Sequence, residues 1–237
     1  TLTPGVFYQM GDDITTSKNI IASGAVMAGL SVAAKITYTG TGSMFTIVNS
    51  VFRANSIVID CPNATAFTIQ GDDTGNINHR LNLTNSVILE CVKIVDSVGA
   101  GGLVLDIVQA TNMTGPAAFT FSNTVSAAIW SFQRVAIIGM TAGSIGFDLG
   151  ASETQEVEIS NVIMFGDSTA TAISGLPNSG NISVQNLGMV DSCNFANFTT
   201  PLVGVDNEDV RWDFQGNAGV SDSISDGLIH TSNNTLE

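Results

Sequence analysis

Two aspartates occupy matching places in two stretches of the chain that follow one pattern. Residues 156–176 (EVEISNVIMFGDSTATAISGL) and 182–205 (ISVQNLGMVDSCNFANFTTPLVGV) each run from Asn through apolar residues to an Asp-Ser pair, which contains Asp167 or Asp191. Hydrolysis of a glycosidic bond uses two carboxyl groups roughly 5 to 9 Å apart, and neighbouring repeats could hold these two at that separation. Asp before Ser is also a common turn residue that caps its own backbone. We favour the turn interpretation and predict no catalytic residues.

The other acidic groups lack the spacing of a metal site. A calcium loop needs acidic or amide residues at alternate positions before a Gly, and no D-x-D-x-D-G stretch occurs. We therefore expect hydrated loops and surfaces, with no metal ligands and no cofactor. The groups concerned are Asp12 and Asp13, Asp72 and Asp73, Glu153, Glu156 and Glu158 (the last two on one strand face), and Asp206, Glu208 and Asp209.

Histidine and tryptophan add no recognisable site. His79 falls in an expected loop and His230 on a late strand; no nucleophile motif lies near either, so we expect surface or hydrogen-bonded histidines. Trp130 follows apolar residues and is expected in the core. Trp212 lies between charged residues, and of the two it is the better candidate for stacking on a glycan.

The three cysteines indicate neither a disulfide framework nor a zinc site. Cys61, Cys91 and Cys193 are odd in number and form no C-x-x-C pair. We expect them to be small buried packing residues.

Charge excludes several classes of partner. The formal net charge is -14, and the seven Lys and Arg residues are scattered singly. Nucleic acids and anionic membranes require clustered basic residues, so we expect neither as a partner. A lyase acting on an acidic polysaccharide would need Lys or Arg beside the substrate carboxylate, which disfavours that activity too.

Composition predicts strands rather than helices. Apolar residues make up 44% of the 237 residues and charged residues only 12%, while Val, Ile, Thr and Phe are common and helix-forming Lys, Arg, Glu and Gln are scarce. The longest stretch without a charge, 107–133, contains Asn, Gly, Pro and Ser, so we do not expect it to cross a membrane.

A loose repeat of some two dozen residues runs along the chain. One series places a polar residue before alternating apolar residues at 55–59, 85–89, 134–138, 161–164 and 186–190. A second series, in another phase, comprises 66–69, 102–107, 118–121, 145–149, 172–175, 201–205 and 227–230. Its spacing aligns Phe121 with Phe147 and Phe147 with Ile173. Two interleaved series with one period indicate several strands per repeat.

These repeats predict an all-β, single-stranded parallel β-helix with about three strands per coil and little helix. Propeller blades need about 40 residues and a Trp-Asp signature in each blade, and leucine-rich repeats need L-x-x-L-x-L; Trp-Asp occurs once, at 212–213, without recurring, and L-x-x-L-x-L does not occur. Alternation within a strand should send Phe119 and Phe121 inward and Thr120 outward. Asn at repeated corners, such as Asn161 and Asn186, should adopt left-handed bends and could form a side-chain ladder.

The opening DDITTSKNIIASGAVMAGLSVAAKITYTGTGSMFTI (12–47) and the repeats punctuated by Asn and Gly resemble the pectin-lyase-like right-handed β-helix proteins. More narrowly, they resemble the tailspike and fibre appendages of tailed bacteriophages. The resemblance covers most of the chain. It implies a homotrimer on a virion, attached to other virion proteins and touching a host surface glycan or receptor; many such proteins also cleave surface polysaccharide.

We divide the chain into an N-terminal capping region with the first coils (1–44), a β-helix body (45–235) and a final pair, 236–237. The final Leu-Glu resembles a cloning-site remnant, and the first residue is not Met. We therefore expect the natural protein to extend further at one or both ends.

Two functions from different classes remain open. The first is a non-enzymatic structural and receptor-recognition module of a phage appendage, located on the virion. The second is a polysaccharide-degrading tailspike that uses a carboxylate pair such as Asp167 and Asp191. A bacterial adhesin or secreted β-helix is a third, weaker alternative. We favour the first because the chain contains no recognisable catalytic set.

Overall fold

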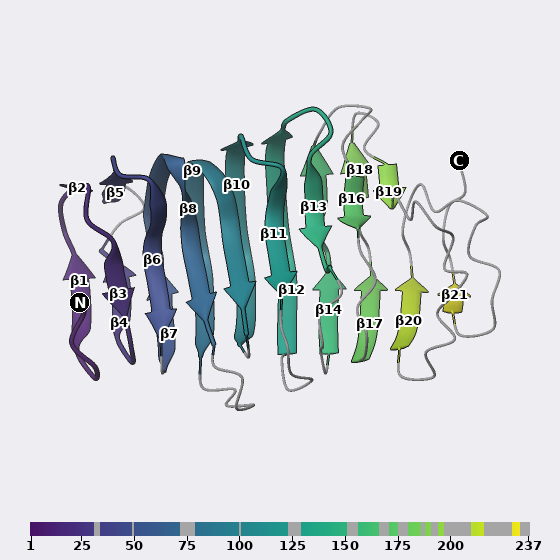
Figure 1. The fold of residues 1–237 in the computed structure, drawn as a ribbon, viewed down its shortest axis with the longest axis horizontal. Helices are drawn as coiled ribbons and strands as arrows, with labels where there is room; N and C mark the ends of the chain where they lie inside the picture. The colour runs from purple at the N-terminus through teal and green to yellow at the C-terminus, as the bar shows by residue number, and fades with distance from the viewer. Residues whose placement is uncertain are drawn as a thin grey trace.

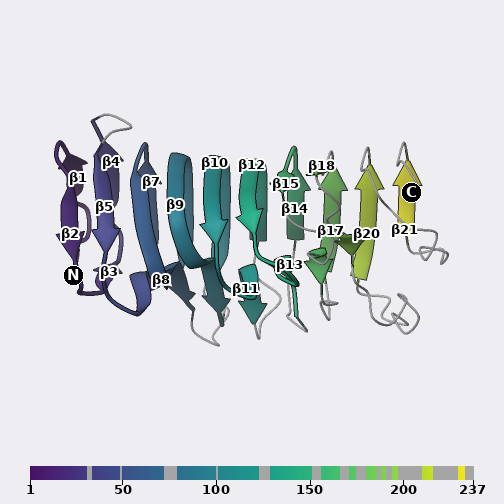
Figure 2. The same cartoon turned by 90° about the horizontal axis from the view of Figure 1, so that it is seen from above.

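The computed structural model describes residues 1–30, 34–48, 50–71, 79–99, 101–122, 129–150, 156–165, 171–174, 180–185, 188–190, 194–196, 210–215 and 229–232. In these ranges the chain forms 21 strands of one sheet and no helix, which confirms the all-β prediction. The strands follow one another in chain order along the long axis of the molecule, from the N-terminus to the C-terminus (Figures 1 and 2).

All strand pairs in the described residues are parallel, and they form three ladders that we call the first, second and third. The first ladder contains β1 (Phe7–Met10), β4 (Val26–Gly29), β7 (Val51–Asn55), the starts of β9 (Arg80–Val98), β10 (Gly102–Met113) and β12 (Ile129–Met140), then β14 (Glu156–Ser160), β17 (Gly180–Gln185), β20 (Val210–Gln215) and β21 (Ile229–Ser232).

The second ladder contains β2 (Ile14–Thr16), β5 (Lys35–Tyr38), the start of β8 (Val58–Gln70), the middle of β9, the ends of β10 and β12, β15 (Ile163–Phe165) and β18 (Gly188–Val190). The third contains β3 (Ile20–Ala22), β6 (Gly42–Val48), the ends of β8 and β9, β11 (Ala117–Ser122), β13 (Ile145–Asp148), β16 (Thr171–Ser174) and β19 (Asn194–Ala196).

The first predicted series lies in the second ladder, with one register error. Ala136 pairs with Ile163 and Ile163 with Gly188, at the predicted spacings of 27 and 25 residues. The predicted spacing of 30 between 55–59 and 85–89 is wrong, because Val58 pairs with Val87, 29 residues away.

The second predicted series mixes two ladders. Residues 102–106 and 229–230 lie in the first ladder, whereas 66–69, 118–121 and 145–148 lie in the third. Apolar and polar residues alternate in all three ladders, so spacing alone could not separate one ladder from another. The segment 201–205 lies outside the described residues.

The predicted column of apolar residues around Phe147 is also out of register, by two residues on one side. Phe147 pairs with Ile173 as predicted, but its partner on the other side is Phe119, not Phe121. Both Phe119 and Phe121 are buried and Thr120 is half-buried, so the predicted alternation is confirmed. Phe121 instead stacks on Trp130, with ring centroids 4.0 Å apart.

Inward residues of the three ladders form one apolar core. Phenylalanines stack along the third ladder, with ring centroids 5.3 Å apart for Phe45 and Phe67 and 5.0 Å for Phe119 and Phe147. Phe132 of the first ladder meets Phe119 and Phe147 edge-on at 4.9 and 4.8 Å. Because partners on neighbouring strands are only about 4.8 Å apart, apolar residues in register must stack directly on one another.

Between the first and second ladders, the chain turns through a column of left-handed residues. Each follows the last first-ladder residue of its strand, and the φ angles are 54° at Ser56, 46° at Asn85, 55° at Ile107, 53° at Arg134 and 53° at Asn161. The left-handed bend predicted at Asn161 is confirmed. Ile107 and Arg134 separate Asn85 from Asn161 in this column. The predicted ladder of Asn161 and Asn186 stays a prediction, because Asn186 lies outside the described residues.

We predict that the core residue Phe67 stabilises the fold far more than its outward neighbour Thr65. Phe67 is fully buried and Thr65 is half-buried. Phe67→Ala should lower the free energy of unfolding by about 3 to 5 kcal/mol, and Thr65→Ala by less than about 1 kcal/mol. Urea denaturation followed by circular dichroism measures both. Equal losses would contradict the assigned inward and outward faces.

We also predict that Ile107→Asn stabilises the isolated chain. A left-handed conformation costs an L-residue roughly 1 to 2 kcal/mol, and the cost is greatest for β-branched side chains, whereas Asn tolerates it. Since 45% of Ile107 is exposed, the substitution should raise the free energy of unfolding by about 1 kcal/mol. The reverse change, Asn161→Ile, should lower it by a similar amount. A loss of stability in the Ile107→Asn variant would contradict this account.

Candidate functional site

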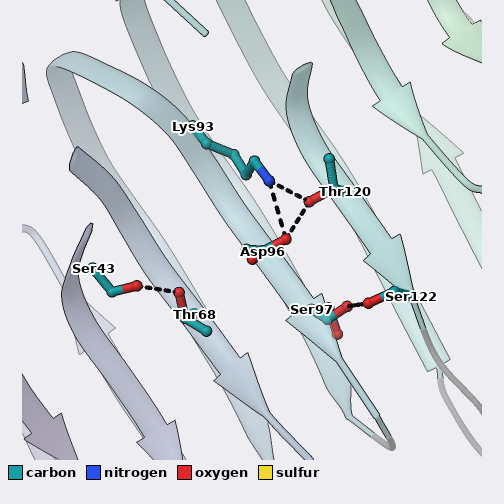
Figure 3. Close-up of polar contacts among 7 residues, drawn as sticks. All are labelled: Ser43, Thr68, Lys93, Asp96, Ser97, Thr120 and Ser122. Carbon is teal, nitrogen blue, oxygen red and sulfur yellow. Dashed lines mark hydrogen bonds and ion pairs between the residues drawn. The ribbon is translucent and has the colours of Figure 1, made fainter. Parts of the chain in front are cut away.

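Polar side chains line the outward face of the third ladder. Ser43 and Thr68 are hydrogen-bonded across neighbouring strands at 2.5 Å between their hydroxyl oxygens. Further along, the Lys93 ammonium donates to Asp96 at 3.1 Å and to Thr120 at 2.8 Å, and the Thr120 hydroxyl also donates to Asp96 (Figure 3). These side chains hydrogen-bond to one another and join β6 to β8 and β9 to β11.

The same face brings together two carboxylates that the sequence analysis did not single out as a pair. Asp96 pairs in register with Thr120, and Thr120 with Asp148, so two strand spacings, or about 9 to 10 Å, separate the two aspartates. This lies near the upper limit for an inverting glycosidase. One sequence feature could have identified this pair: each aspartate directly follows an inward residue of the same ladder.

Both carboxylates already accept hydrogen bonds from groups within the protein. Asp96 accepts from Lys93 and Thr120, and an Asp148 oxygen accepts from the backbone N–H of Gly150 at 3.2 Å. A catalytic acid and base would need to approach a substrate oxygen and a water. The pair is therefore a weaker candidate than its spacing alone suggests.

The outward face of the first ladder carries a second polar group, which we call the first-ladder polar face: Ser131, Gln133, Glu156, Glu158 and Ser160. Glu156 and Glu158 lie on the same face of β14, as predicted, with Val157 buried between them. A Glu158 oxygen accepts from the Ser131 hydroxyl at 3.1 Å and from the Gln133 amide at 3.4 Å. Carboxylate, amide and hydroxyl groups held side by side on a rigid sheet match the hydrogen-bonding groups of a sugar.

A shallow groove of about 340 Å³ follows the left-handed corner, and we call it the corner groove. Beside it, the Arg134 guanidinium donates to Asp106 through two nitrogens, with Nε at 2.7 Å from Oδ1. This hydrogen bond raises the pKa of Arg134 above its ordinary value. The groove is lined by Asn85, Ser86, Val87, Ile107, Val108, Gln109, Arg134 and Ala136.

The second ladder presents an apolar outward face, which we call the second-ladder face. Its members are Val87, Leu89, Ala136, Ile138, Ile163 and Phe165, with Gln109 and Thr111 among them. Exposure reaches 37% for both Leu89 and Ile163. No Asp, Glu, Lys or Arg points outward from the described second-ladder strands between Val87 and Phe165.

Most of the predicted acidic candidates fall outside the described residues. Asp13 is described, and its carboxylate accepts from the backbone N–H of Lys35 at 2.8 Å, which is a structural role; Asp12 is exposed in the same turn. The candidates outside the described ranges are Asp72, Asp73, Glu153, Asp167, Asp191, Asp206, Glu208 and Asp209. The predicted pair of Asp167 and Asp191 therefore stays a prediction.

Histidine and tryptophan occupy other positions. Trp130 is buried, as predicted, and its indole N–H donates to the Gly101 carbonyl at 3.2 Å. His79 is buried immediately before β9 rather than lying on the surface. His230 lies on β21, as predicted, and Trp212 lies on β20; their side chains are outside the description.

Three of the described basic residues pair with acids: Arg134 and Lys35 with an aspartate on a neighbouring strand, and Lys93 with an aspartate on its own strand. Besides Arg134, Lys35 contacts Asp60 at 3.2 Å and Lys93 contacts Asp96 at 3.1 Å. In the described part of the chain, no group of three His, Cys, Asp or Glu residues could hold a metal ion. The same residues include no helix of the length and apolarity needed to span a membrane.

Cys61 and Cys91 are the nucleophilic groups of the core. They pair in register on β8 and β9, are free thiols and are fully buried, as predicted for packing residues; Cys193 lies outside the described residues. Burial is the main cause that raises both thiol pKa values, that of Cys91 from 9.0 to about 12. Neutral thiols in an apolar core are poor nucleophiles.

We predict that both thiols resist alkylation in the folded protein. In a Cys193→Ser background, iodoacetamide at about pH 8 should modify neither cysteine until urea unfolds the chain, as measured by intact mass. Because folding raises the thiol pKa, its stabilising contribution is complete below pH 9 and is lost as the pH rises from 9 towards 12. The urea midpoint should fall across that window. Rapid modification of the native protein would contradict the assigned burial.

Comparison with known proteins gives no functional assignment, so the candidate surfaces are identified from their geometry alone. No family model matches the chain, and neither a characterised protein nor a solved structure does. The candidate surfaces are thus the two polar faces, the corner groove and the second-ladder face.

Proposed function

We propose that the chain forms a right-handed parallel β-helix that serves as a structural and receptor-recognition module of a bacteriophage virion appendage. The supporting observation for the fold is the order of the strands, which pass from the first ladder to the second, then to the third and back to the first. Parallel crossovers of this kind are right-handed in nearly all known proteins, which supports the right-handed sense. The link to a phage appendage comes from the sequence resemblance of the opening repeats.

A rigid shaft suits the mechanical part of this role. Every strand interior to the ladders has a parallel partner on each side, and one apolar core runs through all three ladders. The hydrogen bonds of the third-ladder face join neighbouring strands along the same axis (Figure 3). Such a module would stand on the virion as a homotrimer, with other virion proteins at one end.

The recognition part is best supported by the first-ladder polar face. Its hydroxyl, amide and carboxylate groups are already positioned by contacts among Ser131, Gln133 and Glu158. The net charge of -14 favours a neutral surface polysaccharide over one rich in carboxylates or phosphates. The proposed ligand is therefore a neutral glycan of the host cell surface.

A polysaccharide-degrading tailspike is the second candidate. The observation that favours it is the register spacing of Asp96 and Asp148 on the third ladder, in addition to the predicted pair of Asp167 and Asp191. The hydrogen bonds that already engage Asp96 and Asp148 make this candidate the weaker one.

The test incubates the protein with a panel of purified neutral and acidic bacterial surface polysaccharides. We expect binding to neutral members without release of reducing ends, because the proposal includes no catalysis. Gln133→Ala and Glu158→Ala should each weaken binding by about tenfold, since each removes a positioned hydrogen bond of roughly 1 kcal/mol or more. Gln70→Ala, an exposed glutamine on the third ladder, is the matched control.

Two outcomes would contradict the proposal. Failure to bind any polysaccharide would remove the recognition role. Release of reducing ends that disappears in Asp148→Asn or Asp167→Asn would instead support the glycosidase.

A further inference from the structure

We infer that the second-ladder face, with the corner groove at its edge, is the surface through which copies of this chain associate. This inference rests on the proposed function, which requires an oligomeric shaft, and it adds which of the three faces makes the contact. The occupant of the face is thus a second copy of this chain.

Charge favours the second-ladder face over the other two for contact between copies of the chain. Two copies of a chain with a net charge of -14 repel one another wherever their carboxylates meet. The first-ladder polar face carries Glu156 and Glu158, and the third-ladder face carries Asp96 and Asp148. The described outward residues of the second ladder between Val87 and Phe165 carry no charge. A like copy can approach there without bringing acids together.

The charges near the second-ladder face lie at its margins and are largely balanced. Arg134 and Asp106 pair with each other at the edge next to the first ladder. Lys35 and Asp60 pair on the preceding strands of the second ladder. Glu90 is half-buried at the bend towards the third ladder. An apolar centre with a polar margin is the usual arrangement of a protein interface.

The apolar residues of the face lie on both sides of β10, which contributes the polar residues Gln109 and Thr111. Val87, Ala136 and Ile163 belong to one register column, interrupted only by Gln109, and Ile138 lies beside Phe165 in the next column. Exposed apolar surface gathered on adjacent strands, here β12 and β15, marks interaction sites on soluble proteins. Because the column follows the long axis of the molecule (Figure 1), it suits side-by-side contact of two shafts.

The corner groove provides a depression into which side chains of the neighbouring copy would pack. It opens beside Val87 and Ala136 of the second-ladder face and has a volume of about 340 Å³, enough to receive side chains of a neighbour. Ile107 lines it, 45% exposed and held at φ 55° despite its β-branched side chain. A residue that is both strained and exposed in the single chain is explained if the neighbour covers it, since such strain persists chiefly where function requires it.

The test compares two isoleucines of nearly equal exposure on different faces. Ile163 is 37% exposed on the second ladder and Ile21 is 39% exposed on the third. Both Ile163→Lys and Ile21→Lys change the net charge equally, so a difference in association between them reflects the position of the lysine and not its charge. Light scattering and sedimentation equilibrium give the mass of each oligomer, and circular dichroism verifies that each variant is folded.

We expect the wild type and Ile21→Lys to have three times the 24.6 kDa mass of the chain. In Ile163→Lys the dissociation constant should rise by about 30-fold or more, as for a central interface residue. Ile107→Asn should weaken association while it stabilises the single chain, a combination that a purely structural role would not produce.

The outcomes separate this inference from the proposed function. A monomeric wild type at its highest soluble concentration, or an oligomer that survives both Ile163→Lys and Leu89→Lys but not Ile21→Lys, would overturn the inference. In the second case intact polysaccharide binding would leave the proposed function standing. Association through this face without binding to any polysaccharide would support the inference and count against the recognition role.

Discussion

Parallel pairing in register is the constraint on which the rest of the structure depends. Partners on neighbouring strands lie about 4.8 Å apart, so whatever the chain places inward at one strand must pack against the inward residue of the next. Phe45 on Phe67 and Phe119 on Phe147 are the result. The same rule stacks Cys61 on Cys91. It makes the core a set of columns, and it leaves each outward residue beside its counterpart on the next strand.

Because outward residues also stack, each ladder acquires a face of one chemical character. The third ladder stacks hydroxyl, carboxylate and ammonium groups that satisfy one another. The first ladder stacks carboxylates with amides and hydroxyls. From β9 to β15, the second stacks mainly uncharged apolar side chains, with Gln109 and Thr111 among them. The proposed division of labour, with rigidity, recognition and association on different faces, would follow from this one repeat geometry.

Candidate sites were harder to predict than the fold because they depend on which outward residues become neighbours. Asp167 and Asp191 matched within a local pattern, whereas the pairing of Asp96 with Thr120 and Asp148 depends on register across three strands. Glu156 and Glu158 could be placed on one face because both lie on a single strand, where alternation alone decides. The contacts of Glu158 with Ser131 and Gln133, 27 and 25 residues away, had no local signal.

The sequence by itself determined the strand content, the absence of helix in the described residues, the burial of Cys61, Cys91 and Trp130, and the period of the repeat. These properties follow from residue type and from alternation within a few positions. Only the tertiary structure decided the register, for instance that Phe119 rather than Phe121 meets Phe147 and that Ile107 takes a corner otherwise held mainly by polar residues. The physical reason is that a shift of one alternation keeps every local inward-outward preference satisfied, so only packing between strands can choose between the two alignments.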